Sequence, residues 1–136
     1  MVSSEIAGAV FTVNPVSGER EEIVIEANWG LGESVVSGQT VSDLYRVDKK
    51  LYRIKEKRIA RKEKAFVKGK GGGGEWAAVE PEKVNKPTLT EAQVQEVSRI
   101  ALAIEEHYGY PQDIEWAYEK GVLHILQARR AAVMGE

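Results

Sequence analysis

The sequence predicts an α+β fold with a mostly antiparallel sheet, one main helix at about residues 90–108 and a C-terminal β-hairpin at about residues 112–129. Short segments of alternating apolar and polar residues, one stretch with helical spacing, and Gly- or Pro-containing turns between them indicate this class. A chain of 136 residues, 43% hydrophobic and 29% charged, is long enough for one domain with a real core.

Composition excludes several classes of protein. No apolar run approaches the length of a membrane span, and the first residues lack the basic and apolar regions of a signal peptide. With no cysteine, disulfides, a thiolate nucleophile and a Cys-ligated zinc site are excluded. We therefore expect a cytoplasmic location with no membrane partner, and the net charge of −2 argues against general nucleic-acid binding.

The first third of the chain predicts two paired strands and a loop. Residues 9–13 and 22–27 have strand character, and the turn at residues 14–18 starts with Asn-Pro and ends with Gly. Residues 28–38 contain three glycines, so their backbone could approach a phosphate closely. They match neither the Walker A motif nor GxGxxG, and a tight structural turn is the commoner explanation.

A basic segment follows. Residues 42–48 and 51–57 read as two strands, and residues 48–70 hold eleven Lys and Arg against three Asp and Glu. This +8 segment could bind nucleic acid or phosphate, or it could be a solvated edge hairpin, where Lys prevents unwanted strand pairing. The pattern favours the edge hairpin because aromatic residues do not interleave with the charges. The glycine tract that ends at Gly74 predicts a flexible connector, followed by a short strand at residues 76–80.

The clearest element is the helix. Thr90 and Gln93 form a capping-box pattern, Leu89 can pack on a residue of the first turn, and Gly109 ends the helix. Apolar residues recur at helical spacing and predict the buried stripe; they are Val94, Val97, Ala101, Ile104 and Tyr108. The two histidines, His107 and His124, are isolated and do not predict a metal site.

The C-terminal hairpin carries the most informative pattern. Its loop is expected at residues 119–121, with Gly121 in the left-handed conformation. An odd-length loop places Asp113 and Glu115 on the same face as Gln127 and Arg129. Leu123 and Ile125 are expected on that face too, alternating with the opposite face of Val122, His124, Leu126 and Ala128. Such a face could hold Mg²⁺ and phosphate. It could also be the solvated face of an edge hairpin, and the pattern alone favours this second interpretation.

Four segments together carry a family resemblance. They are Ala7-Gly-Ala-Val-Phe-Thr-Val-Asn-Pro-Val-Ser-Gly18, Glu22-Ile-Val-Ile-Glu-Ala-Asn-Trp-Gly-Leu-Gly-Glu-Ser-Val-Val-Ser-Gly38, Leu89-Thr90 with its helix, and Glu105-Glu-His-Tyr-Gly-Tyr-Pro-Gln-Asp-Ile-Glu-Trp-Ala117 through Leu126-Gln-Ala-Arg129. Over positions 1–130 they resemble, in order, the phosphoenolpyruvate synthase (pyruvate, water dikinase) family. The similar part is the C-terminal half of its N-terminal ATP-grasp domain. Pyruvate phosphate dikinase and rifampicin phosphotransferase share this region.

The resemblance implies roles for the hairpin residues. Glu115 and Gln127 are expected to bind Mg²⁺ that bridges the phosphates of ATP, and Arg129 is expected to contact those phosphates as a catalytic group. Residues 1–130 would be part of the nucleotide-binding domain and residues 131–136 a tail. ATP and Mg²⁺ are then the expected ligands, and Asp113 is only a neighbour.

Departures from the family pattern limit these expectations. The phosphohistidine segment, the pyruvate-binding barrel and the first half of the ATP-grasp region do not occur in the sequence, and Arg130 stands where the family has Pro. We therefore expect a fragment, a split subunit or a truncated reading frame that is inactive alone. A companion chain could supply the rest, self-association is plausible, and a non-catalytic orphan remains an alternative.

Overall fold

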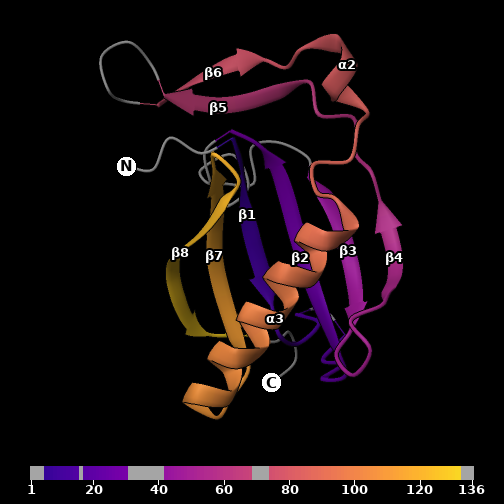
Figure 1. Ribbon diagram of the computed structural model, residues 1–136, viewed down its shortest axis with the longest axis vertical. Helices are drawn as coiled ribbons and strands as arrows, with labels where there is room; N and C mark the ends of the chain where they lie inside the picture. Colours follow the sequence, from indigo (N-terminus) through magenta and orange to yellow (C-terminus); the bar gives the residue numbers. More distant parts are fainter. Residues whose placement is uncertain (1–4, 16, 31–41, 69–73, 133–136) are drawn as a thin grey trace.

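The computed structural model describes residues 5–15, 17–30, 42–68 and 74–132, and in these the predicted α+β class is confirmed. One face of a six-stranded antiparallel sheet is crossed by a long helix, and a two-stranded sheet with a short helix lies beyond one end (Figure 1). The strands of the large sheet run in the order β4-β3-β2-β1-β7-β8. Their bounds are β1 Ile6–Phe11, β2 Glu22–Trp29, β3 Asp43–Asp48, β4 Ile54–Arg58, β7 Gln112–Glu119 and β8 Val122–Arg130.

The core lies between this sheet and helix α3, Glu91–Tyr108. Alternate residues of β2, such as Ile23 and Ile25, are fully buried, as is Trp116 of β7. Removing each aliphatic side chain from water contributes roughly 1.5–3 kcal/mol. The described residues include no helix that is both long enough and apolar enough to cross a bilayer.

The helix follows its sequence signals closely. The Thr90 side chain accepts from the backbone N–H of Gln93, and the Gln93 side chain accepts from that of Thr90, which completes the predicted capping box. Gly109 ends the helix in the left-handed conformation at φ 82°. Of the predicted stripe, only Tyr108 is wrong: it is 51% exposed, because it is the last residue of α3.

The C-terminal hairpin is present, but its turn differs from the prediction. Lys120 and Gly121 form a two-residue turn, both with positive φ, so Glu119 pairs with Val122. A β-bulge then leaves Leu126 unpaired between Ile125, opposite Trp116, and Gln127. The predicted alternation of β8 is therefore wrong at Leu126, and Leu123 and Ile125 lie on the helix side of the sheet.

The basic segment is divided among several environments. Part of it forms edge strand β4, and part forms β5, Lys64–Lys68, which the sequence did not predict. β5 pairs with β6, Gly74–Ala78, and the short helix α2, Pro81–Val84, follows. Gly74 begins β6, while residues 69–73 of the predicted connector lie outside the described residues.

Lys62, which the sequence places in this basic segment, is fully buried. Its Nζ lies 2.6 Å from Oδ1 of Asp43, and both side chains are 0% exposed. The other carboxylate oxygen of Asp43 accepts from the backbone N–H and the hydroxyl of Thr88. The buried charge pair therefore joins β3 to the segments on either side of β5, β6 and α2.

The small sheet is attached to the end of β2. Gly30 forms a bridge with Phe66, and a Cβ at Gly30 would lie 2.3 Å from the carbonyl oxygen of Phe66. The indole N–H of Trp29 donates to the carbonyl of Lys83. A glycine is required at position 30 because any side chain would separate the two sheets.

Candidate nucleotide and metal site

The residues predicted for Mg²⁺ and phosphate lie together on the sheet face opposite α3. Glu115 is the direct cross-strand partner of Gln127, and Asp113 is that of Arg129. Nε of Arg129 donates to Oδ2 of Asp113 at 3.2 Å. Because cross-strand partners point to the same face, the hairpin presents two carboxylates, one amide and one guanidinium side by side.

The β-bulge is what brings these partners together. A two-residue turn with regular pairing would place Glu115 opposite Leu126 and would send Gln127 to the helix side. The extra residue at the bulge restores the arrangement that the sequence prediction had attributed to an odd-length loop. The two-residue turn pairs His124 with Ala117, and the bulge brings Gln127 to the same face, whereas the alternation expected from the sequence puts His124 opposite Gln127.

Strand β2 adds a carboxylate that the sequence analysis did not select. Glu26 and Glu115 both pair with Ala9 of β1, from opposite sides, so the three residues form one row across the sheet. Two strand spacings separate the backbones of the two glutamates by about 10 Å. We call Glu26, Asp113 and Glu115, with Gln127 and Arg129, the acidic half of this face.

The acidic half carries more negatively than positively charged side chains. Burial raises the pKa of the Glu26 carboxyl above its ordinary value, and the negative charge of Asp113 raises it further. Three carboxylates face one guanidinium, which already bonds to Asp113. A cation placed on this face would relieve the repulsion, so the arrangement suits a metal ion or a metal–phosphate complex.

The available ligand atoms suit Mg²⁺ better than they suit an ion whose ligands all come from the protein. In the described part of the chain, no three His, Cys, Asp or Glu side chains converge closely enough to hold a metal by themselves. Mg²⁺ usually takes one or two carboxylates from the protein and completes its shell with water and substrate phosphates. Glu115 and Gln127 can supply such a partial shell.

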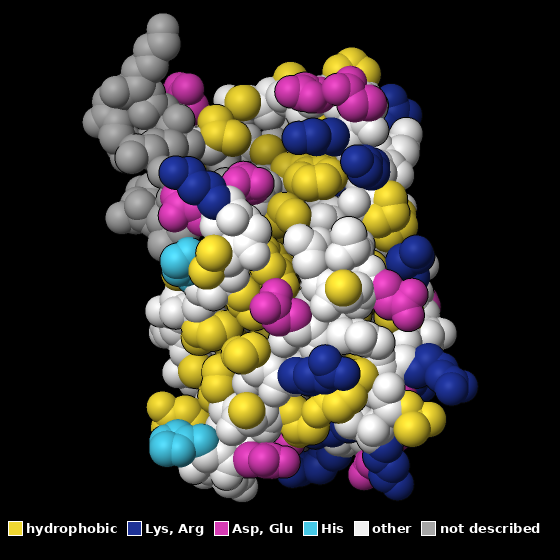
Figure 2. Space-filling model, in the orientation of Figure 1, with side chains coloured by type: hydrophobic (Ala, Val, Ile, Leu, Met, Phe, Trp, Pro, Cys, Tyr) yellow, Lys and Arg dark blue, Asp and Glu magenta, His cyan; other side chains and the backbone are white. Residues whose placement is uncertain are grey.

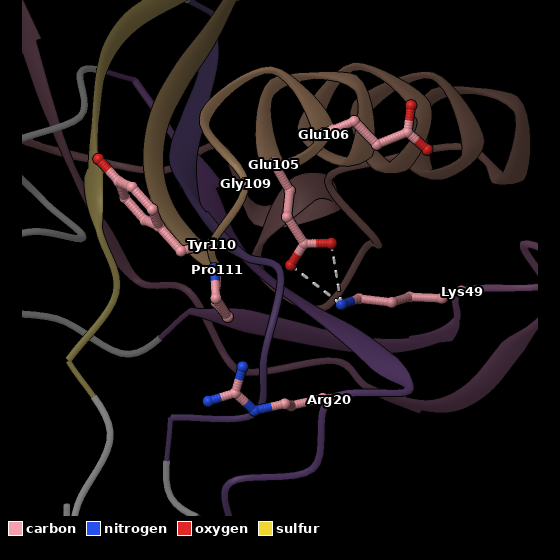
Figure 3. A pocket seen from close by; sticks show the side chains of 7 residues that line it. All are labelled: Arg20, Lys49, Glu105, Glu106, Gly109, Tyr110 and Pro111. Atoms are coloured by element: carbon pink, nitrogen blue, oxygen red, sulfur yellow. Dashed lines mark hydrogen bonds and ion pairs between the residues drawn. The ribbon is translucent and has the colours of Figure 1, made fainter.

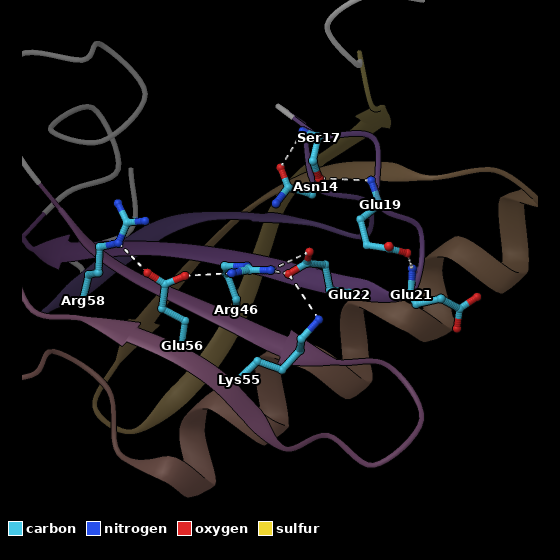
Figure 4. A network of polar contacts seen from close by, with 9 residues as sticks. All are labelled: Asn14, Ser17, Glu19, Glu21, Glu22, Arg46, Lys55, Glu56 and Arg58. Carbon is cyan, nitrogen blue, oxygen red and sulfur yellow. Dashed lines mark hydrogen bonds and ion pairs between the residues drawn. The ribbon is translucent and has the colours of Figure 1, made fainter.

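The other half of the same face is organised differently. The guanidinium of Arg46 bonds to Glu22 at 2.7 Å and to Glu56 at 2.8 Å, and Arg58 also reaches Glu56 (Figure 4). The hydrogen bond from Arg46 lowers the pKa of both carboxyls. We call Glu22, Arg46, Lys55, Glu56 and Arg58 the paired half.

A hollow of about 490 Å³ lies where the two halves meet. Val24 and Leu44 supply apolar surface, while Glu26 and Arg46 supply charge from the acidic and paired halves. An apolar floor beside charged groups is typical of small-molecule sites. The hollow is therefore placed to receive a ligand that also contacts the acidic half.

A second hollow, of about 370 Å³, lies at the C-terminal end of α3 (Figure 3). Nζ of Lys49 bonds to both carboxylate oxygens of Glu105, at 3.1 and 3.2 Å. None of the predicted site residues lines it. Its charges compensate each other, so it does not compete with the acidic half as a cation site.

A comparison with known protein families identifies the family to which the chain belongs. Residues 1–136 match the family described as pyruvate phosphate dikinase, AMP/ATP-binding domain. The chain belongs to this family, which confirms the resemblance inferred from the sequence.

Individual relatives make the relationship more specific. A probable phosphoenolpyruvate synthase of Methanocaldococcus jannaschii is 50% identical over 95% of this chain, and the phosphoenolpyruvate synthase of Pyrococcus furiosus is 46% identical over all of it. The rifampicin phosphotransferase of Bacillus subtilis is 37% identical over 95%. The match spans 11%, 18% and 15% of these three proteins, so the chain corresponds to a small part of each.

Proposed function

We propose that the chain is the Mg-ATP-binding portion of a phosphoenolpyruvate synthase-type dikinase. The observation that carries the proposal is the pairing of Glu115 with Gln127, beside Asp113 with Arg129, on one face of the sheet. Membership of an AMP/ATP-binding domain family supports a nucleotide as the ligand. The higher identities to synthases favour this type over an antibiotic phosphotransferase.

In this proposal each residue has a distinct role. The carboxylate of Glu115 and the amide oxygen of Gln127 orient Mg²⁺, which neutralises phosphate charge when it is bound. Arg129 directs its fork at the phosphates and stabilises the charge that develops on the transferred group. Asp113 holds the guanidinium of Arg129 at the edge of the site before the nucleotide binds.

Other parts of the longer protein would complete the reaction. The reaction proposed for the whole protein converts ATP, pyruvate and water to phosphoenolpyruvate, AMP and phosphate. The 136 residues alone are proposed to bind Mg-ATP without turning it over, with a companion segment or chain closing the site. The relationship to a rifampicin phosphotransferase keeps a second acceptor class as the alternative.

Isothermal titration calorimetry of the chain with Mg-ATP tests the site. We expect Glu115→Ala combined with Gln127→Ala to lower the affinity by about 100-fold, since both metal ligands are lost. The matched control is Glu106→Ala with Gln95→Ala, which removes the same residue types from α3. Equal affinity for the wild type and the site variant would refute the assignment.

The acceptor is tested separately. The 136 residues can replace the matched segment of the Pyrococcus furiosus synthase, and the chimera can be assayed with pyruvate and with rifampicin. Formation of phosphoenolpyruvate that depends on Glu115 supports the synthase-type proposal. Phosphorylation of rifampicin alone would favour the alternative.

A further inference from the structure

An apolar groove runs between α3 and β8, on the helix side of the sheet. Its volume is about 360 Å³, and its lining is almost entirely hydrophobic. The residues that line it are Ile100, Ala103, Ile104, His107, Tyr108, Ile125 and Ala128. Figure 2 shows hydrophobic side chains gathered on the side where α3 approaches β8.

The groove is continuous with the core but is not covered within the described chain. Ile104 and Ala128 pack against the core beneath it. Ile100, Ile125 and Tyr108 are 40%, 40% and 51% exposed. Several large apolar side chains left open in one place indicate an interaction surface rather than scattered surface residues.

The two edges of the large sheet show that this exposure is specific to β8. Edge strand β4 carries charged residues along its length, among them Lys55 and Lys57, and such charges discourage association. On the helix side, edge strand β8 instead presents Leu123, Ile125 and Ala128, and Ile125 is 40% exposed, whereas its other face carries Gln127 and Arg129. The β4 edge suits contact with water, and the helix side of the β8 edge suits contact with protein.

The geometry also restricts how a partner can bind. The bulge at Leu126 interrupts the regular backbone of β8, which disfavours simple addition of another strand. The groove is concave, and a symmetric dimer would place one groove against its copy. A protruding apolar helix or loop from a different segment fits better than a second copy.

We propose that this groove is covered by a segment of the same longer protein that lies outside these 136 residues. The inference rests on the proposed function, in which the chain works as part of a longer dikinase-type protein. The Pyrococcus furiosus relative has more than four-fifths of its length outside the matched part. The covering segment presents apolar side chains to Ile100, Ile125 and Tyr108.

Thiol labelling tests the proposal because the chain contains no cysteine. Ile125→Cys places a thiol in the groove, and Leu51→Cys is the matched control at a 66% exposed position in the turn after β3. Each is labelled in the isolated chain and in the chimera described above, with the host's own cysteines replaced by serine. Val97→Cys, at a buried position of α3, reports that each protein is folded.

We expect the Ile125→Cys thiol to react at least about tenfold more slowly in the chimera than in the isolated chain, because groove burial limits access. The Leu51→Cys thiol should keep its rate. Equal rates for Ile125→Cys in both proteins, with Val97→Cys protected, would overturn the proposal.

Two further outcomes are decisive. If protection in the isolated chain rises with its concentration and Ile100→Glu abolishes it, a second copy covers the groove and the proposal is wrong.

If the chimera does not fold, the isolated chain is mixed with the separately purified remainder of the relative. Protection on mixing supports the proposal, and its absence contradicts it. Labelling uses no nucleotide, so failure of Mg-ATP binding would leave this result unaffected.

Discussion

The acidic half and the paired half lie on one face of the sheet but differ in how far their carboxylates are neutralised by neighbouring cations. In the paired half, Glu22 and Glu56 are both bonded to Arg46, and their pKa values are lowered. In the acidic half, burial raises the pKa of Glu26, and the nearby negative charge of Asp113 raises it further. Groups whose charges are compensated internally stabilise the fold, whereas groups left under mutual repulsion are available to a ligand. We propose that this difference separates structural charge from the charge that binds a ligand on the same surface.

The largest expected effect is the loss of folding stability when Arg46 is removed from the paired half. We expect Arg46→Ala to lower the free energy of unfolding by about 3 kcal/mol, because Glu22, whose side chain is 2% exposed, would lose its main partner. Urea denaturation measures it. Lys55→Ala is the control: its Nζ lies 4.0 Å from Glu22, so its loss should cost no more than about 0.5 kcal/mol. If both variants lowered the free energy of unfolding by a similarly small amount, the paired half would not be a source of stability that distinguishes it from the acidic half.

Two exposed arginines provide a matched test of binding. Arg129 and Arg61 are 65% and 75% exposed, and each pairs with one carboxylate. Removal of either should cost no more than about 1 kcal/mol of stability. Only Arg129→Ala should weaken Mg-ATP binding, by about tenfold or more, because a charge-assisted bond to phosphate is lost. Calorimetry that shows equal losses for Arg61→Ala would mean that the acidic half is not the phosphate site.

A smaller effect is expected at Glu26, and it depends on pH. The folded-state pKa of Glu26 is raised above its ordinary value of 4.5, so the unfolded chain ionises first as pH rises. Its favourable contribution is therefore complete below pH 4.5 and is lost as pH rises through the folded-state pKa. Glu26→Gln should raise the unfolding free energy at pH 7, by less than Arg46→Ala lowers it.

The same titration predicts that this gain disappears below the ordinary pKa, where Glu26 is protonated in both states. The paired half should behave oppositely, since the lowered pKa values of Glu22 and Glu56 mean that its contribution is lost in acid. Urea midpoints measured against pH for wild type, Glu26→Gln and Glu22→Gln separate the two. A Glu26→Gln effect that did not change with pH would contradict the electrostatic cause.

Local signals explain what the sequence predicted well. The helix was predictable because Thr90, Gln93 and Gly109 each specify a terminus through local geometry. The class of fold followed from strand alternation. The shared face of Glu115 and Gln127 was predicted correctly, although the reason given was wrong, since two departures from the predicted hairpin compensate: an even-length turn and a bulge.

Features that depend on distant partners were not predictable in the same way. Nothing in the run from Val122 to Arg129 marks Leu126 as the unpaired residue. Strand β5 was missed because its lysines resemble a solvated segment, and its pairing with β6 crosses the glycine tract. Glu26 looked like one more polar residue of a strand, since only the sheet register places it in the row of Glu115. The roles of Glu115, Gln127 and Arg129 remain proposals.

The buried pair of Lys62 and Asp43 has a consequence for how the molecule opens. Asp43 accepts from the amides of Ala60 and Thr88, so one carboxylate closes two segments that are far apart in the chain. Because both amides donate to the same carboxylate, we expect the hydrogen bonds of Ala60 and Thr88 to Asp43 to break together. Hydrogen exchange at Ala60 and Thr88 should therefore occur in a single opening event, with β5, β6 and α2 detaching as one cooperative unit while the large sheet stays closed.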